Sequence, residues 1–173
     1  MTVVDESMAI NRVDDKDVPA GTILRNQVFQ IHANFRVVHV LLFNNKGDLL
    51  IQRLALTRSR NPGYWGSSVA GYVFAGETYE AAAARRISQE LGLYNVTLTL
   101  FGKTEMYDQE CKKFIDVFIT NHEGPFLYDH THIEQLEFLS LERIHIMRDS
   151  GERPFTPTFL HVLNFFEQGP KAS

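Results

Sequence analysis

One stretch of the sequence decides the fold: GYVFAGETYEAAAARRISQELGL, which runs from Gly71 to Leu93. Thr78 can cap the N-terminus of a helix, the alanines at 81–84 have high helix propensity, and Gly92 suits the left-handed position that ends helices. We therefore predict a helix from about Tyr79 to Leu91, with a glycine-containing loop before it.

Apolar runs on both sides of this helix predict the strands of a sheet. They are VVHVLLF (37–43), LLIQRLAL (49–56), SSVAGYV (67–73), VTLTLF (96–101), KFIDVFIT (113–120) and EQLEFL (134–139). The tight turn NNKG predicts a hairpin between the first two runs. Helices are expected at SLERIHIM (140–147) and FTPTFLHVLNFF (155–166), the second with Thr156 as its cap and Pro157 in its first turn. This order predicts a mixed sheet with helices on both faces, an α/β/α sandwich of the α+β class.

Length and composition predict one domain over residues 1–173, because 173 residues with 44% hydrophobic content can bury one ordinary core. Residues 1–30 form an N-terminal extension with a small acidic hairpin anchored by Val13 and Ile23, and residues 154–173 contain the C-terminal helix. The net charge of −4 argues against a nucleic-acid partner, and no apolar run is long enough to span a membrane.

The compartment follows from the cysteine content and the N-terminal sequence. The single cysteine, Cys111, excludes an intrachain disulfide framework, and we expect it to be a spectator thiol in a reducing compartment. The first residues lack the pattern of a secretory signal. We therefore expect a cytoplasmic protein.

The spacing within Gly71 to Leu93 is similar to that of a known motif. The matching residues are Gly71, Glu77, Arg85, Ile87, Glu90, Gly92 and Leu93. They resemble the Nudix box, a loop–helix–loop that positions magnesium against a diphosphate. The sequence LLIQRLALTRSRNPGYWGSSVAG before the box resembles the branch around isopentenyl diphosphate isomerase. The resemblance covers about residues 10–166 and implies the Nudix fold with its box at 71–93.

The resemblance implies a metal on one face of the helix, where positions 86, 89 and 90 project together. Nudix hydrolases typically carry glutamate at all three positions, whereas this chain has Arg86, Gln89 and Glu90. We expect Mg²⁺, with Mn²⁺ as an alternative, held weakly by Glu90 with help from Glu77 or Gln89. The competing interpretation is a surface ion pair between Arg86 and Glu90.

Isomerase chemistry is not expected, although the branch resembles this chain. The catalytic cysteine of that enzyme aligns with Ala70, its nearby histidine with Tyr72, and its later glutamate with about Lys113. Isomerisation requires a proton donor and a proton acceptor across the alkene, and the loss of the cysteine, the histidine and the glutamate together removes the groups that perform this step.

Several side chains outside the box are candidates for substrate contact. Arg53 and Arg58, with Arg60 as a weaker candidate, carry guanidinium groups that suit diphosphate oxygens, and solvated side chains are the alternative. Trp65 could stack on a base or fill the core. The resemblance implies that Gly71 lines the substrate site.

Histidines provide further candidates. His130, His132 and Glu134 lie where Nudix proteins often carry a late base or metal ligand, and a solvated loop is the alternative. The role of His130 and His132 stays open. His32 and His39 do not align with the metal-binding histidines of the isomerase and are discounted.

These observations predict a magnesium-dependent Nudix pyrophosphohydrolase that cleaves the diphosphate linkage of a nucleoside diphosphate derivative or a related organic diphosphate. The catalytic set is Glu90, Glu77 and Arg85, the last two bracing the loop as the resemblance implies. The alternative is an inactive Nudix domain that binds a nucleotide or a partner. The expected partner is a small-molecule diphosphate, and a homodimer is left open.

Overall fold

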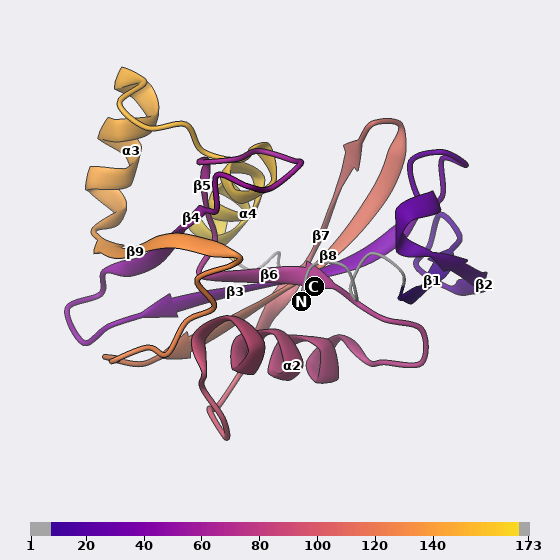
Figure 1. The fold of residues 1–173 in the computed structure, drawn as a ribbon, viewed down its shortest axis with the longest axis horizontal. Helices are drawn as coiled ribbons and strands as arrows, with labels where there is room; N and C mark the ends of the chain where they lie inside the picture. Colours follow the sequence, from indigo (N-terminus) through magenta and orange to yellow (C-terminus); the bar gives the residue numbers. More distant parts are fainter. Residues whose placement is uncertain (1–7, 170–173) are drawn as a thin grey trace.

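The computed structural model describes residues 8–169 (Figure 1). The strands are β1 (Ala9–Val13), β2 (Pro19–Leu24), β3 (Phe35–Phe43), β4 (Leu49–Leu54), β5 (Trp65–Gly66), β6 (Val69–Tyr72), β7 (Thr99–Asp108), β8 (Cys111–Asn121) and β9 (Ile133–Leu139). The helices are the short 3₁₀ helix η1 (Arg25–Gln27), α2 (Tyr79–Leu91), α3 (Leu141–Ser150) and α4 (Pro157–Gln168).

β3 lies at the centre of a mixed sheet. It pairs in parallel with β8 and antiparallel with β6, and the main path of the sheet is β5-β4-β3-β8-β7. β9 pairs with β4. β3 is buried along most of its length, because its run of Val, Leu and Phe packs on both faces of the sheet.

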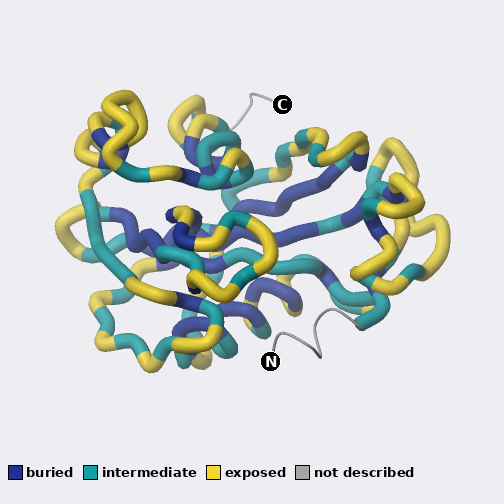
Figure 2. The backbone as a smooth tube through the Cα atoms, turned by 45° about the horizontal axis from the view of Figure 1, so that its top comes forward, coloured by how far each residue is buried: buried dark blue, intermediate teal, exposed yellow. Residues whose placement is uncertain are grey.

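Alternate residues of β3 divide the core into two layers. Val37 and Leu41 belong to one cluster together with α3 and α4, while Val38, Val40 and Leu42 belong to a second cluster with α2. In Figure 1, α2 lies on one side of the sheet and α3 and α4 lie on the other. Figure 2 shows the buried residues concentrated in the strands between them. The predicted sandwich with a mixed sheet is confirmed.

The helices begin at the capping residues that the sequence predicts, and α3 and α4 run three and two residues beyond the predicted stretches. The side-chain oxygens of Thr78, Ser140 and Thr156 accept hydrogen bonds from the first turns of α2, α3 and α4. Gly92 ends α2 in the left-handed conformation. The bounds of α2 are those predicted, and α4 occupies the predicted C-terminal region, of which residues 170–173 lie outside the described part.

The expected hairpin of residues 37–56 is only partly correct. β3 and β4 meet at one antiparallel pair, Phe43 with Leu49, and then diverge. β4 continues beside β5 and β9, while β3 continues beside β6 and β8. The turn was readable from the local sequence, but the partners of each strand depend on distant segments.

The strand predicted at 96–101 began three residues too early and ended seven residues too soon. β7 runs through GKTEMYD to Asp108 and forms a long hairpin with β8, with Gln109 and Glu110 in left-handed conformations at the turn. Most residues of β7 are exposed or half-buried because it lies at the edge of the sheet. Its polar sequence therefore lacks the apolar pattern that marked the other strands.

The predicted N-terminal hairpin is present as β1 and β2, which pair antiparallel. Val13 is buried and Ile23 is half-buried, as expected for its anchors, and bridges from Ile10 to Phe74 and from Val13 to Asn34 tie the hairpin to the sheet. Residues 1–7 of the predicted extension lie outside the described part. Among the helices of residues 8–169, none has the length and apolar character needed to span a membrane.

Candidate active site

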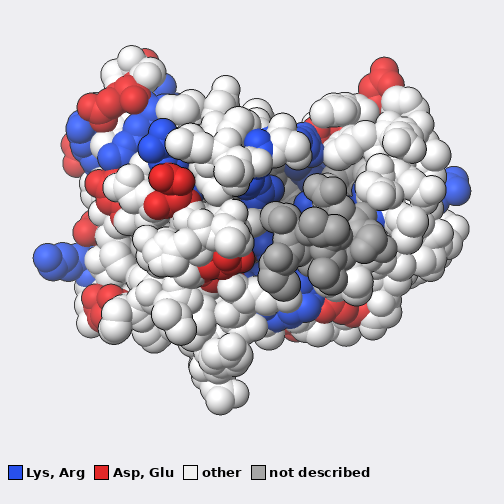
Figure 3. Space-filling view, viewed as in Figure 1, with Lys and Arg blue, Asp and Glu red and all other residues white. Residues whose placement is uncertain are grey.

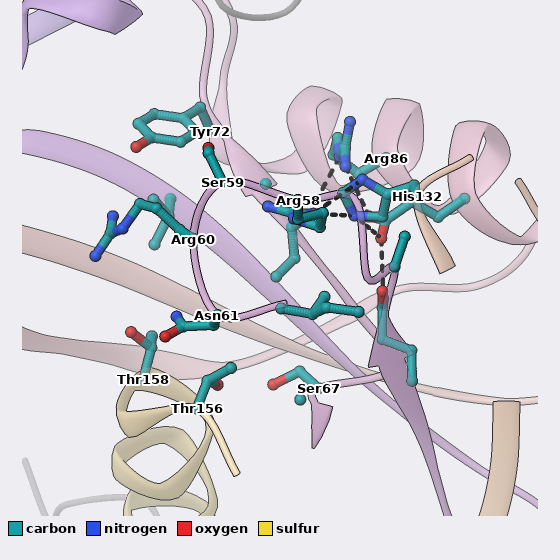
Figure 4. Close-up of a pocket in the computed structure, with 18 of the residues that line it drawn as sticks. Arg58, Ser59, Arg60, Asn61, Ser67, Tyr72, Arg86, His132, Thr156 and Thr158 are labelled. Carbon is teal, nitrogen blue, oxygen red and sulfur yellow. Dashed lines mark hydrogen bonds and ion pairs between the residues drawn. The ribbon is translucent and has the colours of Figure 1, made fainter. Parts of the chain in front are cut away.

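A cavity of about 1120 Å³ opens between the loop 55–61, the start of α4, and the polar face of α2 (Figure 4). The side chains of Arg58, from the loop, and Arg86, from α2, both lie near His132. Thr156 and Thr158 lie at the other side of the cavity. The cavity therefore combines the box helix with segments far from it in sequence.

The cavity is basic although the chain carries a net charge of −4. Its charged lining consists of the cationic residues Arg25, Arg58, Arg60, Arg85, Arg86 and Lys113 and the carboxylate residues Glu90, Asp108 and Glu134. Figure 3 shows Lys and Arg side chains gathered around the middle of the face drawn. Six cations against three carboxylates make this a site suited to an anionic ligand.

Glu90 is the carboxylate at the centre of this cluster, and its side chain is only 2% exposed. Its Oε2 lies 3.1 Å from Nη2 of Arg86, and its Oε1 lies 3.2 Å from Nε2 of His132. Nε2 of Gln52 donates a hydrogen bond of 2.9 Å to Oε1. Burial alone raises the pKa of Glu90, but Arg86 and His132 outweigh burial and lower this pKa to about 2. Glu90 is therefore ionised throughout the neutral range.

The interpretation of Arg86 and Glu90 as a surface ion pair is wrong about its position. The pair exists, but the side chains are 7% and 2% exposed, so it lies inside the protein. Arg86 also donates to the carbonyl oxygen of Ala70 at 3.3 Å and to Oε1 of Gln89 at 3.2 Å. A buried pair responds far more strongly to the loss of one partner than a surface pair does.

Gly71 makes room for the Arg86 side chain. A Cβ atom at position 71 would lie 2.4 to 2.7 Å from Nε, Cδ and Cγ of Arg86, closer than any real contact. The first glycine of the box therefore serves the packing of Arg86 over β6.

We predict that Gly71→Ala lowers the free energy of unfolding by about 1–3 kcal/mol, because the stem of Arg86 is buried and cannot yield without losing its contacts. Urea unfolding measures this change. Gly66→Ala is the matched control, because its added Cβ would meet Thr156 only at an ordinary 3.5 Å. Equal stability of both variants and the wild type would contradict the proposed packing.

Glu77 and Arg85 contact each other at the entrance of α2. Nε of Arg85 lies 2.8 Å from Oε2 of Glu77, and Nη2 of Arg85 lies 3.0 Å from Oε1. Nη2 also donates to the carbonyl oxygen of Tyr72 at 2.9 Å, and Glu77 accepts from the backbone N–H of Phe74 at 2.8 Å. These contacts join the loop to the helix and to β6. The catalytic role assigned to Glu77 and Arg85 stays a prediction.

The side chains expected to hold magnesium do not fit a resident metal ion. Both oxygens of Glu77 face Arg85, Oε1 of Gln89 accepts from Arg85 and Arg86, and both oxygens of Glu90 face the partners described above. Within residues 8–169, no group of three His, Cys, Asp or Glu side chains is arranged to hold a metal. Cationic side chains therefore lie against the oxygens that a metal would need, and Oε2 of Glu90 has the Arg86 ion pair but no hydrogen bond.

The substrate residues expected from the sequence fall into two groups. Arg58 and Gly71 line the cavity, as does the weaker candidate Arg60. Arg53 and Trp65 do not line it, which corrects the expectation for both: Nε of Arg53 donates to the carbonyl oxygen of Gly63, and Trp65 is 5% exposed within the core. Of the two interpretations of Trp65, the structure supports the core.

The later histidines lie in the cavity and not only in a solvated loop. His130, His132 and Glu134 all line it, and the His132 side chain is 15% exposed. Nη1 of Arg58 lies 2.8 to 2.9 Å from the ring nitrogens of His132. His132 is thus held between Glu90 and Arg58.

His39, discounted from the sequence, also lines the cavity. It is buried on β3, and its Nδ1 lies 2.7 Å from Oγ of Ser67. Burial, helped by the nearby Lys113, lowers the pKa of His39 from 6.5 to about 3. By contrast, His32 is exposed, beside Glu110.

The lowered pKa of His39 predicts a pH dependence of stability. The unfolded chain takes up a proton near pH 6.5 that the folded chain refuses, so His39 contributes full stability above this pH and loses it as the pH falls. The expected loss is about 1.4 kcal/mol per pH unit. His39→Asn should flatten the unfolding free energy between about pH 6.5 and 4.5, above the range in which Glu90 adds its own slope. His32→Asn is the control, and equal slopes for His39→Asn and wild type would contradict this assignment.

Arg25 and Lys113 are site residues that sequence reasoning missed. Arg25 comes from η1 and lies 4.3 Å over the ring of Tyr72. Lys113 is 6% exposed, and its Nζ lies 3.1 Å from Asp108 and 2.7 Å from Oγ1 of Thr158. No local motif marks Arg25. Lys113 was named from the sequence only because it stands where the isomerase has a catalytic glutamate.

Comparison with known proteins places this chain in a family. The NUDIX domain model matches residues 33–159. An uncharacterized Nudix hydrolase of Pseudomonas aeruginosa is 29% identical over 154 residues, which cover 89% of this chain and 90% of that protein. The isopentenyl-diphosphate Delta-isomerase of Corynebacterium diphtheriae is 39% identical over 84 residues, covering 46% of this chain and 44% of that enzyme.

Solved structures show the same fold. A Deinococcus radiodurans protein superposes with a TM-score of 0.79 at 24% identity, covering 90% of this chain and 98% of that one. The NUDIX domain of NrtR from Shewanella oneidensis, solved with ADP-ribose, has a TM-score of 0.62 at 11% identity, covering 90% and 92%. Arg25 precedes the residues matched by the domain model, so the cavity has a contribution from outside it.

Proposed function

We propose that this chain, which belongs to the Nudix family, hydrolyses the diphosphate linkage of a small organic diphosphate in the basic cavity. The family model and the relative named as a Nudix hydrolase support a pyrophosphohydrolase. The observation that carries the substrate class is the charge of the cavity, which has six cations and three carboxylates in a chain of net charge −4. A diphosphate is the anion that such a set of guanidinium groups binds well.

The charged side chains around His132 support hydrolysis. Glu90 is ionised, so it accepts the Nε2 hydrogen of His132 and leaves Nδ1 as a proton acceptor. Water attacks one phosphorus atom, its proton goes to Nδ1, and the bridging P–O bond breaks to give two phosphorylated products. A phosphate that draws Arg58 away from His132 would free Nδ1 for this step.

Magnesium dependence was predicted from the resemblance, but the oxygen atoms observed near the box do not support it. The carboxylate and amide oxygens near the box already have cationic or N–H partners. We therefore assign the neutralisation of substrate charge to Arg86, Arg58 and Lys113, which all line the cavity.

Ligand binding without turnover is the second candidate function. The buried ion pair between Arg86 and Glu90 favours it, because a binding site needs fixed cations but no activated water. Isomerisation is not proposed: Ala70 and Tyr72 line the cavity without a thiol or imidazole, and the one cysteine, Cys111, is buried outside the lining.

A product screen tests the proposal. Nucleoside diphosphates, sugar nucleotides including ADP-ribose, and prenyl diphosphates are incubated with the full chain and either magnesium or manganese, and phosphorylated products are separated. Hydrolysis of at least one class is expected. Compounds that raise the melting temperature but give no product with either ion would instead support the binding function.

A further inference from the structure

The side chains near the box do not fit the metal ion that the family implies, and a cationic side chain lies there instead. Arg86 occupies the helix face that carries Glu90, only one turn away, and its guanidinium lies 3.1 Å from the carboxylate. A cation is therefore already present where the resemblance placed an ion. This cation is covalently part of the chain.

Arg86 is held in a defined position. A side chain that takes the place of a metal ion must be fixed in this way. Glu90 and the carbonyl oxygen of Ala70 anchor its guanidinium, and Gly71 leaves space for its stem. The side chain is 7% exposed and still lines the cavity. Little conformational entropy remains to be lost when a ligand binds.

Two further arginines bring positive charge to the cavity. Arg58 contacts His132, and Arg25 lies over the ring of Tyr72. Within the described residues neither forms an ion pair with a carboxylate, and both line the cavity. Lys113 faces the same space, although Asp108 partly neutralises it. The excess positive charge in the cavity is thus carried mainly by Arg25 and Arg58.

We propose that the cavity binds the diphosphate group directly, without a metal ion, through Arg86 and Arg58. Guanidinium groups donate paired N–H bonds to phosphate oxygens, and the charge of a side chain as buried as that of Arg86 is weakly screened. Glu90 is then a positioning residue that fixes Arg86 and His132. This inference rests on the proposed function for its ligand class, but it concerns binding and not turnover.

Calorimetric titration of inorganic pyrophosphate into the full chain in EDTA tests the inference. Wild-type protein is expected to bind, and Arg86→Gln to weaken the affinity at least tenfold. Arg58→Gln should weaken the affinity for pyrophosphate by a similar factor while leaving the Arg86–Glu90 pair intact. This variant therefore tests the inference even if Arg86→Gln does not fold. Arg143→Gln is the matched control, because Arg143 is an exposed arginine paired with Glu152.

The outcomes separate this inference from the proposed hydrolysis. Binding that occurs only after magnesium is added, or that is unchanged in both cavity variants, overturns metal-free binding and leaves hydrolysis standing. Equal losses in Arg143→Gln and the cavity variants also overturn it, since binding would then follow net charge. Binding in EDTA with the expected losses supports the inference, even where no diphosphate is turned over.

Discussion

Glu90→Gln is expected to lower the free energy of unfolding by roughly 3–5 kcal/mol at neutral pH, since removing one partner of a buried ion pair strands the other. Glu90 is 2% exposed, and its loss leaves the Arg86 guanidinium without its carboxylate. The cost is far larger than for an exposed helical position, which the sequence alone suggested. Urea unfolding at neutral pH measures it.

The pH dependence of the same variant gives the sign of the effect. The pKa of Glu90 is lowered from 4.5 to about 2, so its contribution is complete above pH 4.5 and is lost as the pH falls toward 2. The difference between wild type and Glu90→Gln should shrink over this range. Glu152→Gln, which removes the carboxylate of an exposed pair, should cost less than about 1 kcal/mol. Similar small losses in both variants would show that Glu90 does not anchor the cluster.

The double variant Arg86→Glu with Gln89→Glu is expected to convert the site into a metal-dependent one. It places three carboxylates at i, i+3 and i+4, where they repel one another inside the protein unless a cation binds. The melting temperature without metal should fall by about 10 °C or more, since about 1 kcal/mol corresponds to 2–4 °C at this chain length. Magnesium should restore much of this loss.

Calorimetry and thermal melting with and without magnesium check the conversion. Wild-type protein is the control, in which magnesium should produce no comparable rise. A double variant that gains no magnesium affinity would mean that positions 86, 89 and 90 do not share one usable face. Pyrophosphate binding in EDTA should also be lost, because Arg86 has been replaced.

The parts of the fold set by local interactions could be predicted from the sequence. The bounds of α2 follow from Thr78 and Gly92, whose effects act within one turn of the helix. The pairing of β4 with β9 joins residues that lie about 80 to 90 positions apart, and nothing local encodes it. β7 was too polar for its full length to be recognised, because an edge strand needs no continuous apolar run.

Residues of the box were named from their spacing, whereas Arg58 and His132, which also line the cavity, were named only from residue type and position in the chain. Gly71 and Glu90 stood at box spacing, and both lie at the cavity. Arg25 reaches it through the packing of the N-terminal hairpin, which sequence spacing does not reveal. Trp65 shows the opposite error, since an aromatic residue beside Pro-Gly can face either a ligand or the core, and only the tertiary structure decides.

Hydrolysis in water labelled with ¹⁸O tests the central claim most directly. The full chain is incubated with the diphosphate panel, and the products are examined by mass spectrometry. The account predicts one ¹⁸O atom in one of two phosphorylated products, because water attacks phosphorus. Absence of any labelled product across the panel, while the same compounds raise the melting temperature in EDTA, would contradict it.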